Sequence, residues 1–315
     1  MTYDMIIIGA GPAGLTAAIY AGRAKMKTLL VSDAIPGGQV MLTEAIENYP
    51  GFKAVIQGPE LMNNMYEQAK KLEIEFERLK AKNISKEKDG FLVKTEKGEF
   101  KSLSLIIATG ASYKVLGAKG EKEFVGRGVS YCGVCDAPLF RDKEIAVIGG
   151  GDTAVYEAMH LLKFCSKLHI VHRRDRLRAT KIMQERILGN KKTVMHWNST
   201  LEEIYGSKLV EGIKIKDVKN GNVTEVPSRG VFIFVGIKPN SEIVKGFLKT
   251  DKKECILAGE NMETSCRGIF ACGDVRKKIL RQISTAVGDG AEAAFSAQQF
   301  VEELKGIAYP PRTGS

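Results

Sequence analysis

Two cysteines and an aspartate stand close together in the stretch VSYCGVCDAP, residues 129–138. Cys132 and Cys135 enclose two residues, and Asp136 follows directly. Such a pair could form half of a zinc site, a structural disulfide, or a thiol pair that exchanges electrons with another disulfide. Exchange needs one thiolate to attack a sulfur and a second thiol to resolve the mixed disulfide, and a neighbouring acid can protonate the departing thiolate. These ten residues alone leave the three chemistries open.

The overall composition sets the class of protein. The chain has 315 residues, 44% of them hydrophobic, which is enough for more than one domain. It has no apolar run approaching the ~20 residues of a membrane span, and its first residues lack the basic region of a signal peptide. We therefore expect a cytoplasmic protein without a membrane segment. Cysteines are normally reduced in that compartment, which disfavours a purely structural disulfide.

Charge and cysteine spacing exclude two further classes. The formal net charge is +10, but the lysines are spread along the chain. Nucleic-acid binding requires a clustered basic stripe or a known binding motif, so we expect no nucleic-acid partner. A structural zinc site usually needs four ligands, often from a second C-x-x-C, and the wider spacing of Cys266 and Cys272 does not supply one. We therefore expect no metal, and the choice between a structural and a redox-active pair depends on what the rest of the chain binds.

The first thirty residues have the pattern of a dinucleotide-binding unit. An apolar strand over residues 3–8 precedes Gly9, Gly11 and Gly14, and a helix over 15–24 and a strand over 28–32 follow. In the G-x-G-x-x-G pattern the first glycine allows a tight turn, the second lets the backbone approach a pyrophosphate, and the third allows close helix–strand packing. The helix N-terminus binds the phosphates. Asp33, at the end of the second strand, can accept a hydrogen bond from a ribose hydroxyl.

The same pattern returns 140 positions later. Gly9 aligns with Gly149, Gly11 with Gly151 and Gly14 with Ala154, which is also small. Asp33 aligns with Arg173, and an arginine at this place suits a 2′-phosphate in the way that an acid suits a free 2′-hydroxyl. Arg174 and Arg178 add positive charge, and guanidinium groups match phosphate oxygens. We expect FAD on the first copy and NADPH on the second.

Taken together, the motifs resemble those of the low-molecular-weight thioredoxin reductases over nearly the whole chain, from residue 3 to about 304. In order they are GAGPAG, GGQ with IENYPG, IIATGA, RGVSYCGVCD, GGGDTA, HRRDRLRA, GVFIFVGIKPN and GIFACGDV with RQISTAVGDG. The resemblance implies an α/β fold with two Rossmann-like dinucleotide-binding domains. The FAD domain would comprise residues 1–115 and 243–315, and the inserted NADPH domain, residues 116–242, would carry the C-x-x-C pair. Segments rich in Gly, Lys and Pro near 110–123 and 236–242 suit the two crossings.

The resemblance also implies the binding residues. In the family, Asp274 binds the ribityl chain of the flavin, and the helix expected from about residue 281 to 304 begins facing the ring. The full FAD set comprises Gly9, Gly11, Gly14, Asp33, Gly38, Gln39, Asn48, Thr109, Gly110, Gly273, Asp274, Arg281 and Gln282. The NADPH set comprises Gly149, Gly151, Asp152, Thr153, His172, Arg173, Arg174 and Arg178.

The implied activity is thioredoxin-disulfide reduction, with electrons passing from NADPH through FAD and the Cys132–Cys135 pair to thioredoxin or a thioredoxin-like small protein. Asp136 is the expected general acid. The resemblance makes Cys135 the sulfur that faces the flavin, and which sulfur attacks the partner stays open. Arg127 matches a position that contacts thioredoxin. The family further implies a homodimer, and a rotation of the NADPH domain that lets one pair serve both reaction partners.

Several positions depart from the family pattern and keep other partners open. Gly133 and Val134 stand where the pair usually encloses Ala-Thr, and Cys272 stands where Ala is usual. The alternatives are a reductase of a glutaredoxin-like protein or a peroxiredoxin system, an enzyme that takes electrons from ferredoxin, and a flavin sensor without enzymatic activity. Ferredoxin–NADP reductases of similar fold lack the cysteine pair. The four other cysteines are interpreted as packing or surface residues: Cys165, Cys255, Cys266 and Cys272.

Overall fold

The computed structural model describes residues 2–43 and 46–307, with the side chain of Cys135 left undescribed. Residue 1, residues 44–45 and residues 308–315, all within the range predicted for the FAD domain, lie outside the described residues. The chain divides into two compact units. The first combines the two ends of the chain, Met1–Ser112 and Lys238–Ser315, and the second is Tyr113–Ile237.

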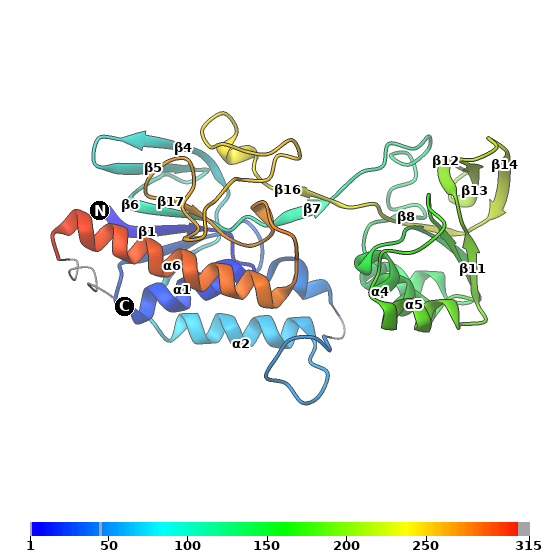
Figure 1. Ribbon diagram of the computed structural model, residues 1–315, viewed down its shortest axis with the longest axis horizontal. Helices are drawn as coiled ribbons and strands as arrows, with labels where there is room; N and C mark the ends of the chain where they lie inside the picture. Colours follow the sequence, from blue (N-terminus) through cyan, green and yellow to red (C-terminus); the bar gives the residue numbers. More distant parts are fainter. Residues whose placement is uncertain (1, 44–45, 308–315) are drawn as a thin grey trace. The chain divides into compact units, whose positions relative to one another are not determined.

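The first unit is built on a mixed sheet whose strands run in the order β3-β2-β1-β6-β5-β4, with β17 paired to β6 (Figure 1). Strands β1, β2, β3, β6 and β17 pair in parallel, whereas β4, β5 and β6 form an antiparallel meander. The strands are β1 Thr2–Ile8, β2 Thr28–Val31, β3 Glu75–Glu77, β4 Ala81–Glu87, β5 Gly90–Thr95, β6 Glu99–Ile107 and β17 Ile269–Ala271.

Three helices accompany this sheet: α1 Pro12–Arg23, α2 Gly58–Lys70 and α6 Ile283–Lys305. Figure 1 shows α1 lying beside α6. Successive side chains of a strand point to opposite faces of the sheet. Met5 and Ile7 of β1 accordingly pack in one core with α1 and α6, while Ile6 and Ile8 pack in a second core with strands β4 to β6 and the segment around Val275.

The carboxyl ends of the central strands coincide. Ile8 lies opposite Val31 of β2 and opposite Ile107 of β6, and Ala271 of β17 also lies opposite Ile107. The residues that follow these strands therefore leave the sheet at one edge. In parallel α/β sheets, ligands bind outside the carboxyl ends of the strands. This edge is consequently the place where the first unit can hold a cofactor.

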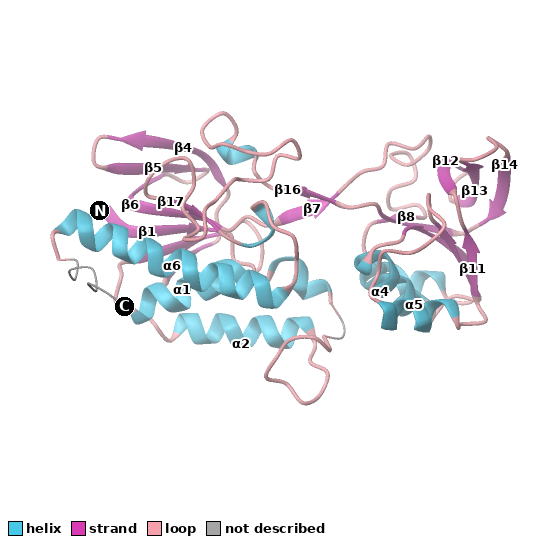
Figure 2. Cartoon of the chain, in the orientation of Figure 1, coloured by secondary structure: helices cyan, strands magenta, loops and turns pink. Residues whose placement is uncertain are grey.

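The second unit repeats this construction with an all-parallel sheet in the order β11-β10-β9-β15-β8. Its strands are β8 Val129–Ser130, β9 Glu144–Gly149, β10 Lys167–Val171, β11 Thr193–His196 and β15 Gly230–Phe234. Helices α3 Gly133–Asp136, α4 Asp152–Leu161 and α5 Lys181–Leu188 belong to the same unit, and Figure 2 distinguishes its helices from its strands. A separate antiparallel sheet comprises β12 Ser199–Gly206, β13 Val210–Asp217 and β14 Val223–Pro227.

The strand–turn–helix–strand pattern predicted for both repeats is present. Strand β1, helix α1 and strand β2 correspond to strand β9, helix α4 and strand β10 in the second unit. Two short strands, β7 Ala111–Tyr113 and β16 Ile237–Pro239, pair where the chain passes between the units. None of the described helices combines the length and apolar character that a transmembrane span requires.

Candidate active site

The glycine turn of the first unit leaves an open place at the start of α1. Gly9 follows β1 with φ of +110°, a backbone conformation that residues other than glycine rarely adopt. Gly11 is the N-cap of α1, and no described atom lies within 4 Å of the position that a Cβ would take there. A Cβ at Gly14 would overlap the carbonyl oxygen of Gly9. The turn is therefore tight, closely packed at Gly14 and open at Gly11. This arrangement fits a pyrophosphate at the helix N-terminus.

Of the other predicted residues of the first unit, Gly38 comes to the same turn from a distant part of the sequence. A Cβ at Gly38 would lie 3.4 Å from the Cα of Gly11. Gln39, the next residue of the 3-10 helix Gly38–Leu42, donates from its amide Nε2 to the carbonyl oxygen of Ala111. Asp33 is exposed two residues beyond the end of β2.

Thr109 and Gly110 follow β6 and are held by the returning chain. The Thr109 hydroxyl donates to the carbonyl oxygen of Asn240 at 2.6 Å, and the Asn240 amide Nδ2 donates to the carbonyl oxygen of Thr109 at 2.9 Å. Gly110 has φ of +67°, and its carbonyl oxygen accepts from the Asn240 N–H at 3.0 Å. Asn240, which sequence reasoning did not single out, thus fixes the path of this segment.

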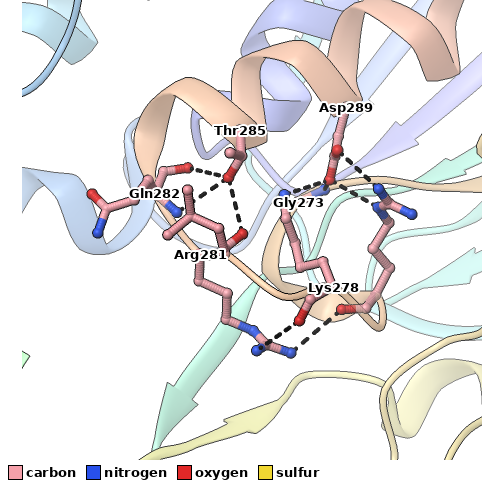
Figure 3. A network of polar contacts seen from close by, with 8 residues as sticks. Gly273, Lys278, Arg281, Gln282, Thr285 and Asp289 are labelled. Atoms are coloured by element: carbon pink, nitrogen blue, oxygen red, sulfur yellow. Dashed lines mark hydrogen bonds and ion pairs between the residues drawn. The ribbon is translucent and has the colours of Figure 1, made fainter. Parts of the chain in front are cut away.

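A buried ion cluster centred on Asp289 of α6 holds the turn after β17 (Figure 3). Its carboxylate accepts from the Gly273 N–H at 3.0 Å, from Arg276 Nε at 2.9 Å and from Lys278 Nζ at 2.7 Å. Burial acts to raise the pKa of Asp289, but the hydrogen bonds from Arg276 and Lys278 outweigh it and lower that pKa. The carboxylate is therefore charged at neutral pH and fixes the Gly273 backbone.

Two side chains beside this cluster retain unused hydrogen-bonding atoms. Asp274 Oδ1 and Arg281 Nε are buried without a partner among the described residues. The other Arg281 nitrogens donate to the carbonyl oxygens of Lys278 and Arg276 at 3.4 and 3.5 Å, and Nη2 also approaches Cys255 Sγ at 3.5 Å. Burial raises the pKa of Asp274, against the opposing charges of Lys278 and Arg281. Because an unsatisfied buried polar group costs about 1–3 kcal/mol, these atoms fit a site for a polyhydroxyl ligand.

Gln282 begins helix α6 and links it to another predicted residue. Its backbone N–H donates to the Thr285 hydroxyl at 3.2 Å, as part of a capping box. Its side-chain oxygen accepts from Asn48 Nδ2 at 3.1 Å. Asn48 and Gln282 are 234 residues apart in sequence, so the structure brings together two distant members of the predicted FAD set.

The second unit contains the matching glycine turn. Gly149 ends β9 with φ of +149°, and Gly151 is the N-cap of α4. A Cβ at Gly149 would lie 2.8 Å from the Cβ of Ala154, so the small residue at 154 preserves the close packing. Asp152 accepts from the Thr180 N–H at 2.9 Å, and Thr153 is exposed.

The predicted phosphate cluster follows strand β10. Arg173, Arg174 and Arg178 are exposed, and the Arg178 N–H donates to the carbonyl oxygen of Gly150 at 2.6 Å. Arg178 Nη2 lies 3.7 Å from the position that a Cβ would take at Gly151, so its guanidinium group is near the turn. His172 is buried, and its pKa is lowered by burial and by the three arginine charges. These positive groups at the strand end fit the phosphorylated ribose of a nicotinamide nucleotide.

Cys132 lies in the same unit and is disulfide-bonded. Its N–H donates to Ser130 Oγ at 3.0 Å, and its carbonyl oxygen accepts from the Asp136 N–H at 3.4 Å, which closes the single turn of α3. Asp136 is half-buried. The side chain of Cys135 is outside the described residues, so its pairing with Cys132 stays a prediction. The four other cysteines are free, and all but the half-buried Cys266 are buried: Cys165, Cys255, Cys266 and Cys272.

Arg127, the predicted partner-binding residue, is exposed and held by its own segment. Its guanidinium group donates from Nε to the carbonyl oxygen of Glu123 at 3.2 Å and lies 5.5 Å from the ring centroid of Phe124. The side chain is therefore in contact with the neighbouring residues of its own segment.

Glu157 of α4 is a residue that sequence reasoning missed. It is 6% exposed, and its Oε2 accepts from the N–H of Val134 at 3.2 Å, between the two cysteines. Burial raises its pKa to about 7, although the backbone N–H groups of Gly133 and Val134 act to lower it. The signal was its place on the apolar face of a predicted helix, where Ala154, Ala158 and Leu161 are also buried.

Comparisons with known proteins agree with this geometry. The family model for pyridine nucleotide-disulphide oxidoreductases matches residues 3–290. The thioredoxin reductase of Bacillus subtilis is 48% identical over 304 residues, covering 96% of each chain. The crystal structure of Lactococcus lactis thioredoxin reductase, in its FR conformation, superposes with a TM-score of 0.94 at 48% identity, covering 96% of this chain and 100% of that one. The thioredoxin reductase structure from T. acidophilum gives 0.90 at 33% identity, covering 96% and 99%.

These similarities extend over both units and confirm the predicted fold class, two Rossmann-like domains of which one is inserted into the other. Members of the matched family work with a flavin and a nicotinamide nucleotide. The chain therefore belongs to the pyridine nucleotide-disulphide oxidoreductase family, and to the branch of it that contains the thioredoxin reductases.

Proposed function

We propose that the protein is an NADPH-dependent thioredoxin-disulfide reductase. The observation that carries this proposal is the disulfide-bonded Cys132 in the same unit as a glycine turn with an arginine cluster, together with a second glycine turn in the other unit. The B. subtilis and L. lactis relatives bear the name thioredoxin reductase. We assign FAD to residues 1–115 with 243–315, and NADPH to residues 116–242.

When bound, the two nucleotides would supply hydride transfer and a route for two electrons to a disulfide. The residues of the first unit bind and orient. Gly11 and the start of α1 hold the pyrophosphate, and Asp33 holds a ribose hydroxyl. Asp274 accepts hydrogen bonds from hydroxyl groups through Oδ1, which has no partner among the described residues. Gln282, joined to Asn48, holds the start of α6 in place.

In the second unit, Gly149 and Gly151 receive the pyrophosphate of NADPH, while Arg173, Arg174 and Arg178 bind its 2′-phosphate. The redox pair is Cys132 with Cys135, and Asp136 protonates the departing thiolate. Because one pair cannot contact a flavin and an external protein at once, the proposal includes movement of one unit against the other. Arg127 binds the partner protein, thioredoxin or a thioredoxin-like protein. A homodimer in the cytoplasm, without nucleic-acid or membrane partners, completes the proposal.

The test begins with the visible spectrum of the purified protein under anaerobic conditions. We expect a flavin spectrum that bleaches with NADPH, and steady consumption of NADPH when thioredoxin disulfide is added. The variant Cys135→Ser should bind FAD and accept hydride but show no multiple turnover, because exchange needs both sulfurs. Colourless protein would overturn the proposal.

The same experiment separates the remaining alternatives. Bleaching by NADPH without reduction of thioredoxin would direct the search to a glutaredoxin-like protein or a peroxiredoxin system. A flavin that bleaches only with reduced ferredoxin would identify a ferredoxin-dependent enzyme. A flavin that responds to reductant but passes electrons to no disulfide would indicate a sensor.

A further inference from the structure

Glu157 lies directly behind the backbone that joins the two cysteines. Its Oε2 accepts from the Val134 N–H at 3.2 Å, and a Cβ at Gly133 would overlap the same oxygen. The two residues enclosed by the C-x-x-C pair are thus in contact with one buried carboxyl. Glycine at 133 leaves the room that this contact requires.

Burial is the largest influence on the pKa of Glu157 among the described residues, ahead of the hydrogen bonds that it accepts. Its carboxyl accepts from the N–H groups of Gly133 and Val134 on α3, and its charge acts on the phenol of Tyr113 on β7. Tyr113 has its pKa raised to about 12, by burial first and then by the charge of Glu157. His160, one turn further along α4, is also buried. Burial is the main reason that Glu157 titrates near neutral pH.

We propose that Glu157 is a positioning residue for the redox pair, which fixes the backbone between Cys132 and Cys135 and sets through its charge how readily their disulfide is reduced. This inference rests on the proposed redox role of the pair. Reduction of the disulfide breaks the S–S bond, and the two electrons and two protons that make two thiols come from an external dithiol, which is itself oxidised to a disulfide. At alkaline pH the product is partly a thiolate, because free cysteine titrates near pH 8.5.

A carboxylate close to the pair disfavours that thiolate, because like charges repel strongly in a buried environment. The effect depends on pH. Below the pKa of Glu157 both its carboxyl and the thiols are neutral, and the electrostatic penalty vanishes. Above that pKa the carboxylate opposes thiolate formation and makes the reduced state less favourable. A contribution from packing alone would be the same at every pH.

The experiment compares the FAD-loaded wild type with Glu157→Gln, which keeps the shape and the acceptor oxygen but cannot become charged. Each protein is equilibrated with mixtures of reduced and oxidised dithiothreitol at pH 5.5 and pH 9. Free thiols are then alkylated, and the peptide that contains both cysteines is quantified by mass spectrometry, separately from the four other cysteines. We expect equal equilibrium constants at pH 5.5. At pH 9 the variant should be about tenfold easier to reduce, which equals about 30 mV for a two-electron couple.

Glu144→Gln is the matched control, since it removes a carboxylate from the same unit, where Glu144 pairs with Lys167 at 3.0 Å and with His169 at 3.2 Å. It should follow the wild type at both pH values. The inference would be overturned if the equilibrium constants of Glu157→Gln and the wild type were equal at pH 9, if the variant were harder to reduce there, or if the two differed by the same factor at both pH values. If Glu157→Gln does not fold, infrared difference spectra of reduced minus oxidised wild type decide: a carboxyl band that titrates near pH 7 and changes on reduction supports it, and its absence overturns it.

This measurement uses neither NADPH nor a partner protein. Failure of the proposed reductase activity would appear as absence of turnover with thioredoxin. If Glu157 does not tune the pair, the wild type and Glu157→Gln would show the same pH dependence of the dithiol equilibrium, even in an active enzyme.

Discussion

Asp289 accepts a hydrogen bond from the backbone N–H of Gly273, 16 residues earlier in the chain, at 3.0 Å. The same carboxylate holds Arg276 and Lys278, and all three ionic side chains are largely shielded from solvent. One acidic residue of α6 thereby fixes the turn that precedes Asp274, the residue assigned to the flavin. Removing its charge leaves two cations without their partner.

We predict that Asp289→Asn lowers both stability and FAD content. Breaking a buried ion pair by removing one partner costs about 3–5 kcal/mol, because it leaves an uncompensated charge. The measurements are the thermal midpoint and the ratio of flavin to protein absorbance. The control is Glu303→Gln, which removes an exposed partner of Arg267 and should cost no more than about 1 kcal/mol. Equal effects of the two substitutions would contradict this assignment.

Because of Glu157, we predict that the free energy of unfolding depends on pH. Its pKa is raised from 4.5 to about 7 in the folded protein, so the folded state binds the proton more tightly. The stabilisation is fully present below pH 4.5 and is lost as the pH rises through about 7. A pKa shift of one unit corresponds to about 1.4 kcal/mol, so the lost stabilisation amounts to roughly 3 kcal/mol. Chemical denaturation of Glu157→Gln between pH 4.5 and 8 should show a smaller loss than the wild type, and parallel curves would refute the raised pKa.

The parts of the fold that sequence predicts best are those fixed by local chemistry. An apolar strand, spaced glycines and an apolar helix specify the turn around Gly9, because residues other than glycine rarely adopt its φ of +110°. The requirement for a small residue at the third position is equally local, as the closeness of Ala154 to Gly149 shows. The two repeats, and the order of strand, turn, helix and strand within each, could therefore be predicted without a structure.

Contacts between distant segments could not be predicted in this way. Thr109 and Asn240 exchange hydrogen bonds across 131 residues, and nothing in either local sequence identifies the other. Glu157 was visible as an acid on an apolar helix face, but the sequence did not show what lies opposite. A helix pattern gives the face on which a residue lies, whereas its electrostatic role depends on the segment that packs against that face.

Coenzyme choice is predicted to depend on the arginines after β10. Hydrogen bonds to charged groups contribute about 1.5–3 kcal/mol each, so losing two contacts in Arg173→Ala/Arg174→Ala should reduce kcat/KM for NADPH by about 10²–10⁴-fold. NADH lacks the 2′-phosphate, and its use should change little. Arg141→Ala, which removes an arginine near the Phe164 ring, is the control and should leave both values unchanged. A double variant that keeps its NADPH preference would assign these arginines another role.

Asp136 is predicted to act in only one half of the reaction. Asp136→Asn keeps the shape and removes the acid, and a general acid typically contributes about 10²–10⁴-fold. Stopped-flow absorbance should show unchanged reduction of the flavin by NADPH and slowed reoxidation of the flavin by the disulfide. If both phases are unchanged, Asp136 does not supply the proton.

Gly11 and Gly14 lie three residues apart but should fail in different ways when changed to alanine. At Gly11 no described atom lies within 4 Å of the new Cβ, and the φ of −75° suits any residue. Gly11→Ala should therefore fold with a thermal midpoint close to that of the wild-type apoprotein, and lose FAD because the Cβ occupies the place of the pyrophosphate. At Gly14 the Cβ would overlap the carbonyl oxygen of Gly9, so Gly14→Ala should lower the stability of the apoprotein itself. Calorimetry of both apoproteins, followed by titration with FAD, separates the two effects. A Gly11→Ala variant that binds FAD as tightly as the wild type would show that the open place above α1 is not the pyrophosphate site.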